Sequence, residues 1–367
     1  MRPWTPKIPR TNTTFPAIPQ RFGDPMTTSV RPSRLLKTLG ALALALGLTA
    51  SLAACAPASG STGEATTVSD GADSGVWPRT ITHELGKTTI PAQPKKVVST
   101  SLTLTGTLLA IDAPIAASAA GTPGNGLDKN GFFDQWGEVA SKRGVDVLYP
   151  NLELDLESVT AAKPDLIVIS MTGADSTKDA YEQLSKIAPT IALNYSTQSW
   201  EDIAKQLGPA LGLEKQVDET ISDFSGKIAE AKAKIAAPAG NVQAVVFNGA
   251  QEDTAFALTT GPHNALLTEL GLPITNPEFP GDKPAASDRK DFQFLSAENA
   301  VVSLTAPTVL LVSADDATKE KLVSAPAFAN IPALNGGTVV PLGLNSFRID
   351  YYSALEVANT LVNAFRA

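Results

Sequence analysis

Residues 96–115 read KVVSTSLTLTGTLLAIDAPI and contain the pattern from which the fold of this chain can be predicted. The run KVVSTS at 96–101 has the β-branched composition of a buried strand. Residues 102–111 follow with helical potential, and the Asp-Ala-Pro sequence at 112–114 ends that helix. A strand, a helix and a returning strand form the unit of an open α/β sheet. We therefore expect an α/β fold.

The same order of elements recurs in the second half of the chain. The run VQAVVFN at 242–248 is again suited to a buried strand, and LLTELGLPI at 266–274 resembles LLAIDAPI at 108–115. A second pair of similar segments consists of Glu157 with a short helix and KPDLIVIS (163–170), and Glu298 with a short helix and APTVLLVS (306–313). Because both pairs occur in the same order, the sequence predicts two lobes of one design.

A single long helix is expected between the lobes, over residues 213–237. Its apolar residues are spaced alternately by four and three, and they are Val217, Ile221, Phe224, Ile228, Ala231 and Ile235. At ~1.5 Å per residue this helix would be roughly 36 Å long. We therefore expect two Rossmann-like lobes, at 77–212 and 238–367, joined by one long helix, with a partly preformed ligand cleft between them.

The composition excludes several functional classes. A net charge of −8 argues against nucleic acid as the partner, so an anion site would have to be a local basic cluster. One Cys and two His exclude an internal disulfide and a multi-histidine metal site. The sequence also lacks a G-x-S-x-G elbow, a P-loop, an H-E-x-x-H pair and a G-x-G-x-x-G turn after a strand. We expect a binding protein and not an enzyme.

The N-terminal region has the organisation of an exported lipoprotein precursor. Three basic residues after Met26 precede an apolar run at 39–54, which is typical of an export signal and falls short of the ~20 residues of a spanning helix. The LAAC sequence ending at Cys55 looks like a lipobox, so Cys55 is expected to carry lipid after cleavage of residues 26–54. The alternatives are an uncleaved anchor helix and a plain secretory signal.

The segments on either side of this signal have no expected fold. Residues 1–25 contain six of the 27 prolines, and translation is expected to begin at Met26; an unusually long leader is the alternative. Residues 55–76 are small and polar and predict a flexible stalk. Together these segments predict a protein anchored by lipid to the outer face of the cytoplasmic membrane.

Anionic ligands of α/β units bind beyond the carboxyl ends of the strands, where helix N-termini offer free N–H groups. Three loops qualify, and they contribute Ser101 with Thr103, Thr122 with Asn125, and Arg348. Arg348 is the principal candidate because it precedes the last helix, which Asp350 or Ser353 can cap. The alternative is a surface ion pair between Arg348 and Asp350.

Two further arginines are weaker candidates for the same site. They are Arg143 in the sequence Lys-Arg-Gly and Arg289 in the sequence Asp-Arg-Lys-Asp. Each could equally lie in a solvated loop.

Four segments resemble the ferric-enterobactin-binding proteins of ABC importers. They are WPRTIT (77–82), VVSTSLTLTGTLLAIDAPIAASA (97–119), the pairs Asn-Tyr and Ser-Trp (194–195 and 199–200), and FRIDYYSA (347–354). The resemblance runs from about Trp77 to the C-terminus, and it implies substrate-binding proteins in which one long helix joins two α/β lobes.

The resemblance also implies ligand contacts. Arg348, in the matching FR-x-D-YYSA motif, would contact the catecholate oxygens of a ferric siderophore, whose charge of about −3 suits guanidinium donors. Arg289 and Arg143 match basic positions less distinctively. Trp136 would offer an aromatic face, although a large apolar side chain also suits a core. Phe256 lies where relatives can carry a Trp, and it would take that ring's place.

Glu157 and Glu298 match the acidic residue that each lobe of these proteins offers to arginines of the permease. Two equivalent lobes meeting a two-fold permease should each present one carboxylate. The alternative is that both residues stabilise helix N-termini.

The resemblance further implies a monomer whose ligand is a ferric siderophore, with no cofactor and no metal held directly by the protein, because the siderophore holds the iron. Two alternatives remain open. The same fold could bind haem, cobalamin or a hydroxamate siderophore, or the protein could be an exported siderophore esterase.

Overall fold

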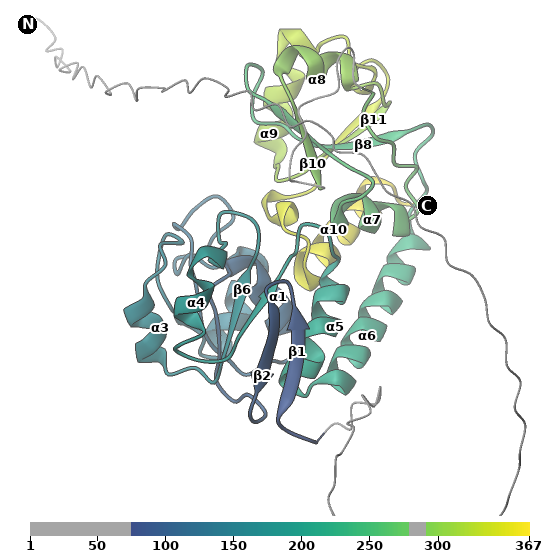
Figure 1. Cartoon of the computed structure of the whole chain (residues 1–367). Helices are drawn as coiled ribbons and strands as arrows, with labels where there is room; N and C mark the ends of the chain where they lie inside the picture. Colours follow the sequence, from purple (N-terminus) through teal and green to yellow (C-terminus); the bar gives the residue numbers. More distant parts are fainter. Residues whose placement is uncertain (1–74, 279–290) are drawn as a thin grey trace, which may run out of the picture. The chain divides into compact units, whose positions relative to one another are not determined.

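The computed structural model describes residues 75–278 and 291–367. Within these residues it contains two five-stranded sheets and a separate two-stranded hairpin (Figure 1). The first sheet is entirely parallel and has the order β5-β4-β3-β6-β7. Its strands are β3 (Val97–Ser99), β4 (Ile115–Ser118), β5 (Asp146–Val147), β6 (Leu166–Ser170) and β7 (Thr190–Leu193). The predicted strand at 96–101 is therefore confirmed as the central strand β3.

The second sheet has the corresponding order β10-β9-β8-β11-β12. Its strands are β8 (Val242–Val246), β9 (Thr254–Ala257), β10 (Phe292–Leu295), β11 (Thr308–Leu311) and β12 (Thr338–Pro341). The strands β8, β11 and β12 are parallel, as in the first lobe, whereas β9 and β10 are antiparallel. At the end of the LLTELGLPI segment, Ile274 makes an isolated bridge to Val242 and is not part of a strand. The hairpin strand β9 occupies the place that β4 has in the first sheet, so the repeat is closest on the β8, β11 and β12 side.

The helices follow the strand ends as the sequence predicts. Ser101 begins α1 because its side chain accepts a hydrogen bond from the Leu104 N–H. The α-helices are α1 (Leu102–Ala110), α2 (Asp134–Lys142), α3 (Leu156–Ala162), α4 (Tyr181–Leu184), α5 (Trp200–Leu211), α6 (Glu214–Lys232), α7 (Pro262–Glu269), α8 (Ala297–Ser303), α9 (Asp316–Val323) and α10 (Tyr351–Ala364). The 3₁₀ turns are η1 (Lys178–Ala180), η2 (Pro326–Phe328), η3 (Pro332–Leu334) and η4 (Leu344–Phe347), and the hairpin is β1 (Arg79–His83) with β2 (Gly86–Ile90).

The connecting helix α6 is shorter than the predicted helix at 213–237. It has 19 residues and ends at Lys232, and it lies beside α5 (Figure 1). The predicted apolar stripe is confirmed where it is helical, because Val217, Phe224 and Ile228 are buried. Beyond the helix, Ile235 pairs with the backbone of Arg366. The last apolar position of the stripe thus belongs to an extended segment held by the C-terminus.

The final helix α10 packs on α6 and also on α1 and α2, which cover the first sheet. One hydrophobic cluster consequently extends from Val97 and Trp136 in the first lobe to Val242 and Val357 in the second half of the chain. A second cluster around Phe247 and Phe328 and a third around Val98 and Ile167 fill the outer layers of the two lobes. Residues 238–367, predicted as one lobe, therefore send their last helix onto the other.

Candidate ligand-binding site

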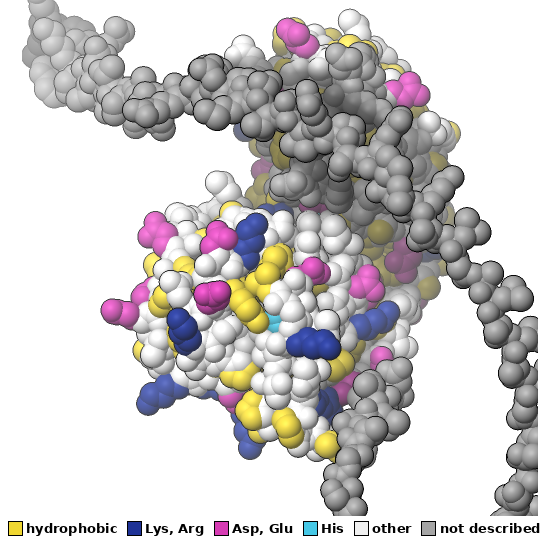
Figure 2. Space-filling view, in the orientation of Figure 1, with side chains coloured by type: hydrophobic (Ala, Val, Ile, Leu, Met, Phe, Trp, Pro, Cys, Tyr) yellow, Lys and Arg dark blue, Asp and Glu magenta, His cyan; other side chains and the backbone are white. Residues whose placement is uncertain are grey.

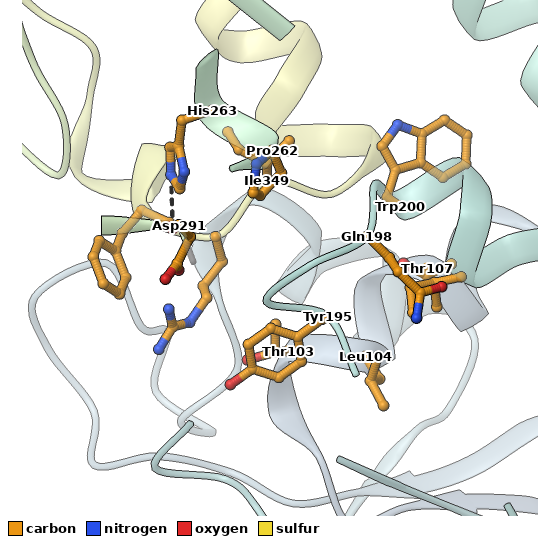
Figure 3. Close-up of a pocket in the computed structure, with 13 residues that line it drawn as sticks. Thr103, Leu104, Thr107, Tyr195, Gln198, Trp200, Pro262, His263, Asp291 and Ile349 are labelled. Atoms are coloured by element: carbon orange, nitrogen blue, oxygen red, sulfur yellow. Dashed lines mark hydrogen bonds between the residues drawn. The ribbon is translucent and has the colours of Figure 1, made fainter. Parts of the chain in front are cut away.

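A pocket lies between segments of both halves of the chain (Figure 3). It contains about 440 Å³ of space, part of which is open to solvent. The face of α1, the loop after β7 and the start of α5 form one side. The start of α7, the residue before β10, and the end of η4 with the segment after it form the other. The lining residues are Thr103, Leu104, Thr107, Tyr195, Gln198, Trp200, Ile203, Pro262, His263, Asp291, Phe347, Arg348 and Ile349.

Arg348 supplies positive charge to this pocket. Its guanidinium carbon lies 4.3 Å from the ring centroid of Phe347 and 5.7 Å from that of Tyr195, so it contacts aromatic rings from both sides of the pocket. Its backbone carbonyl accepts a 2.5 Å hydrogen bond from the Ser353 hydroxyl. No carboxylate among the described residues forms an ion pair with this half-buried side chain. The alternative of an Arg348–Asp350 pair is therefore wrong.

Asp350 is instead occupied in capping α10. Its Oδ1 accepts 2.9 Å hydrogen bonds from the N–H groups of Tyr352 and Ser353, and Ser353 Oγ accepts from the Asp350 N–H in return. Its Oδ2 accepts a 3.3 Å hydrogen bond from the side chain of Gln135 on α2. Burial raises the pKa of Asp350 to about 6, although these hydrogen bonds oppose the rise. The predicted cap is confirmed.

His263 forms part of an aromatic wall. Its Nε2 lies 3.1 Å from the Ser346 carbonyl oxygen and 3.0 Å from that of Phe347, so Nε2 carries the proton and Nδ1 is an acceptor. Nδ1 is buried without a hydrogen-bond partner among the residues that the structure describes. The ring packs edge-on against Phe292, which stacks on Phe347 at 5.5 Å. Burial lowers the pKa of His263 to about 4, so the ring is neutral near pH 7.

The opposite wall is built around Tyr195 and the buried Asp175. The Tyr195 hydroxyl donates a 2.8 Å hydrogen bond to Asp175 Oδ1. Asp175 Oδ2 accepts from Ser101 Oγ at 2.6 Å and from the Thr103 N–H at 2.8 Å. Burial, followed by the charge of Asp175, raises the pKa of Tyr195, so the phenol stays protonated.

The N-terminus of α1 therefore does not offer free N–H groups to a ligand. The Thr103 N–H is bonded to Asp175 and the Leu104 N–H to Ser101. What α1 presents to the pocket is its side chains, including those of Thr103 and Thr107. The expectation that an anion binds this helix terminus directly is wrong, because a carboxylate of the protein already occupies it.

Comparisons with known proteins identify the family to which this architecture belongs. A family model described as a periplasmic binding protein matches residues 97–343. The chain belongs to this family of periplasmic binding proteins. It is 39% identical to the ferric enterobactin-binding periplasmic protein FepB of Escherichia coli O6:H1, over 79% of this chain and 91% of that protein. It is 33% identical to a putative ABC transporter substrate-binding lipoprotein, YhfQ of Bacillus subtilis, over 52% of this chain and 57% of that protein.

Solved structures give the same result. The chain in the crystal structure of holo-ViuP is 40% identical in sequence to this one. The two superpose with a TM-score of 0.74 over 80% of this chain and 96% of that chain. The substrate-binding protein PiaA of Streptococcus pneumoniae TIGR4, at 24% identity and a TM-score of 0.61, covers 78% of this chain and 99% of its own and shares the fold. The predicted two-lobed α/β class is confirmed, and the family consists of substrate-binding proteins of transport systems, not enzymes.

Several residues predicted to bind ligand lie elsewhere in this periplasmic binding protein. Ser101 is fully buried as the N-cap of α1. Thr122 is exposed and donates to the side chain of Asn151 at 2.8 Å. Asn125 is exposed in a turn with a φ of 52°. This turn is close to the second lobe, because a Cβ at Gly126 would lie 3.1 Å from Asn345 Oδ1. None of these residues lines the pocket.

Trp136, Phe256 and Arg143 are structural residues in the described chain. Trp136 is fully buried and packs against Phe132, and Phe256 is 1% exposed within the core of the second lobe. Arg143 donates to the carbonyl oxygens of Leu109 at 2.9 Å and Ala113 at 2.6 Å, and it therefore holds the end of α1. The predicted aromatic and basic ligand contacts at these three positions are wrong, because their side chains are committed to packing or to backbone acceptors.

Two predicted residues lie outside the described part of the chain. They are Arg289 and the lipidation candidate Cys55, together with the export signal at 26–54. In residues 75–278 and 291–367, no helix combines the length and apolar character needed to cross a bilayer. Within the same residues, no three His, Cys, Asp or Glu side chains are grouped as metal ligands would be.

Glu157 and Glu298 have matching surroundings in the two lobes. Each is the second residue of a seven-residue helix, α3 or α8, and each is exposed. Asp155 and Ser296 cap these helices. Both helices precede the strand that lies next to the central strand of its sheet, β6 or β11. The predicted equivalence of the two positions is confirmed, and their contact with a permease stays a prediction.

Sequence reasoning misses much of the pocket. It includes Tyr195 and Trp200 only as family matches and counts His263 only as one of two histidines, and it does not identify Asp175 or Gln198 at all. A Tyr, a Trp and a Gln within the seven residues 194–200, directly after a buried strand, are an available signal, because loops at strand ends carry ligand contacts.

Proposed function

We propose that this protein is an extracytoplasmic receptor that captures a ferric catecholate siderophore of the enterobactin type and delivers it to an ABC permease. The observation that carries the proposal is the Arg348 guanidinium, which lines the pocket between aromatic rings without an ion pair to any described carboxylate. A half-buried cation without an ion pair to a described carboxylate favours an anionic ligand, and charge-assisted hydrogen bonds to catecholate oxygens would neutralise it.

The aromatic lining supports a ligand with planar rings. Tyr195, Phe347 and the buried Trp200 all line the pocket, and their ring faces and edges suit catechol groups. Trp200 Nε1 is a buried donor without a hydrogen-bond partner among the described residues. The relative FepB, a ferric enterobactin-binding protein, supports the same assignment.

The test is to titrate the purified protein with ferric enterobactin, a ferric hydroxamate, haem and cobalamin. Tryptophan fluorescence is the readout of binding. We expect saturable quenching by ferric enterobactin, because Trp200 lines the pocket, with an affinity beyond about −8 kcal/mol. Arg348→Ala should weaken binding by about tenfold or more, since a hydrogen bond to a charged group contributes about 1.5–3 kcal/mol. Arg348→Lys keeps the charge but not the guanidinium fork, so it should recover part of the affinity.

Two outcomes would contradict this function. Binding of haem, cobalamin or a hydroxamate in preference to ferric enterobactin would assign a different ligand to the same fold. An unchanged affinity in Arg348→Ala would remove the electrostatic basis of the proposal. Incubation with the siderophore followed by mass spectrometry tests the esterase alternative, and we expect the ligand to be recovered intact.

Delivery to the permease is proposed to use Glu157 and Glu298, which are exposed at equivalent places in the two lobes. Charge reversal at either position should lower siderophore-stimulated ATPase activity of the reconstituted importer without changing the affinity for the siderophore. Glu153→Arg, in the exposed segment just before α3, is the matched control. Equal effects of Glu153→Arg and Glu157→Arg would refute a specific contact.

Attachment to the membrane is proposed to occur through lipid on Cys55, with residues 55–76 as the stalk. Mass spectrometry of the mature N-terminus should find acyl chains on Cys55, and Cys55→Ala should release the protein from membranes.

The receptor is also proposed to act as a monomer without a cofactor. Light scattering of the purified protein tests the monomeric state. The surface shown in Figure 2 has positive and negative side chains interspersed, which suits a soluble receptor better than a nucleic-acid-binding protein.

A further inference from the structure

The buried Asp175 has no place in ligand capture as described so far. It is 5% exposed, lies in the loop after β6 and does not line the pocket. Both of its oxygens are nevertheless used. Oδ1 accepts from the Tyr195 hydroxyl, and Oδ2 accepts from Ser101 Oγ and the Thr103 N–H. A buried carboxylate with three donors is firmly held, so it fixes the position of whatever it binds.

Two of the residues that Asp175 binds, Tyr195 and Thr103, form one wall of the pocket. Tyr195 and Thr103 lie next to each other at the pocket and both line it (Figure 3). The hydroxyl end of Tyr195 fits tightly between Asp175 and Gly173, because a Cβ at Gly173 would collide with it. Gly173 also has a φ of 85°, which disfavours any other residue. The phenol is thus tethered on one side and confined on the other.

This tether determines which part of Tyr195 faces the ligand. The hydroxyl points to Asp175, and the ring lies 5.7 Å from the Arg348 guanidinium of the other lobe. Loss of the tether would free the ring to rotate about its two side-chain torsions. The ring would then no longer be preorganised opposite Arg348, and that loss would appear as weaker binding.

We propose that Asp175 is a positioning residue that holds the Tyr195 hydroxyl away from the ligand, so that the ring face of Tyr195 and the guanidinium of Arg348 together form a site for a planar, anionic aromatic group. The inference rests on the proposed function, because it names the ligand group that this part of the pocket receives. Asp175 acts only through Tyr195 and touches no ligand.

A double-mutant cycle tests this role, with affinity for ferric enterobactin measured by tryptophan fluorescence on the purified protein. Asp175→Ala and Tyr195→Phe should each weaken binding by about tenfold. The affinity of the double variant should be less than about twofold below that of either single variant. Additive losses would overturn the proposal, because Asp175 would then act independently of Tyr195. Wild-type affinity in Tyr195→Phe would also overturn it, even where Asp175→Ala fails to fold.

Asp175→Asn separates positioning from mere stability. Its oxygen can keep accepting from Ser101 and Thr103, and its amide can donate to the Tyr195 hydroxyl, so the tether survives with reversed polarity. We expect affinity within about threefold of wild type even if the melting temperature falls. Asp165→Asn is the matched control, because Asp165 accepts from the N–H groups of Lys95 and Lys96 far from the pocket lining. Affinity losses in Asp175→Asn as large as in Asp175→Ala would overturn the proposal.

A ligand-free measurement keeps the two proposals distinguishable. With ¹³C-labelled tyrosine, the Tyr195 ring carbon bonded to oxygen should shift in Asp175→Ala and remain in place in Asp165→Asn. If ferric enterobactin fails to bind the wild type but this shift occurs, the proposed function is wrong and the tether stands. An unchanged Tyr195 signal in Asp175→Ala refutes the tether itself.

Discussion

Asp350→Asn should stabilise this protein at neutral pH, although it removes a carboxylate that caps a helix. Asp350 is 3% exposed, and only Oδ1 is well used, by the N–H groups of Tyr352 and Ser353. Asn is as good a cap as Asp, so its oxygen can keep both bonds. The new side-chain amide would face Gln135, whose buried Oε1 has no hydrogen-bond partner in the described part of the chain. After a flip of the Gln135 amide, that oxygen could accept a hydrogen bond from the new amide.

The magnitude follows from the pKa of Asp350. Burial raises this pKa from 3.8 to about 6, and such a rise corresponds to about 3 kcal/mol because each pKa unit is worth about 1.4 kcal/mol. The native state binds the proton more tightly than the unfolded state. The contribution to stability is therefore complete below pH 3.8, and it is lost as the pH rises through about 6. The variant lacks this loss, so its advantage should grow from near zero at about pH 4 to about 3 kcal/mol at about pH 7.

Urea unfolding of wild type and Asp350→Asn across this pH range measures the effect, with the difference between the two curves isolating Asp350 from other titrating groups. Asp165→Asn serves as the control for the same substitution at an exposed carboxylate. Parallel stability curves for wild type and Asp350→Asn would refute the reasoning. So would a variant that is less stable at pH 7 than wild type, since the carboxylate would then contribute more than its burial penalty.

Three further predictions address residues whose roles the structure reassigns. Phe256→Ala should lower the free energy of unfolding by about 3–5 kcal/mol through a cavity in the second lobe, while calorimetry of siderophore binding finds an unchanged affinity; a selective loss of affinity would restore Phe256 as a ligand contact. Arg143→Ala should lower stability by about 1–3 kcal/mol through the loss of two charge-assisted hydrogen bonds, to the carbonyls of Leu109 and Ala113, again with unchanged affinity. The wild type should lose about 3 kcal/mol of stability as the pH falls from 6.5 to about 4, because the unfolded histidine binds the proton more tightly than the folded one. His263→Gln should lack this loss. Identical acid unfolding of variant and wild type would contradict the prediction.

Local signals explain why the core of the fold could be predicted. The β-branched run at 96–101 and the cap at Ser101 are adjacent in sequence, and both are present in β3 and α1. The end of α6 could not be located in this way. Ile235 continues the apolar period, but its partner is the backbone of Arg366, which is far away in sequence. Periodicity reports that a residue is covered, and it does not report what covers it.

The candidate site could be predicted less completely than the fold, for the same reason. Arg348 is found because an arginine before a capped helix is a local pattern. The tether between Asp175 and Tyr195 joins two loops, and nothing near Asp175 in sequence marks it as a buried acceptor. The prediction for Phe256 rested on the family resemblance, and it is wrong because all four residues of β9 are buried, so both faces of this strand are covered by the core.

The two walls of the pocket neutralise charge in different ways, and this difference bears on how a ligand would join them. In the first lobe, the charge of Asp175 is met by donors from Ser101, Thr103 and Tyr195. In the second lobe, aromatic rings contact Arg348, but no described carboxylate pairs with it. Cation–π contacts offset only part of the penalty of desolvating a cation. We therefore expect ligand charge, more than apolar area, to decide which molecules hold the lobes together, so that a neutral complex of equal size would bind more weakly.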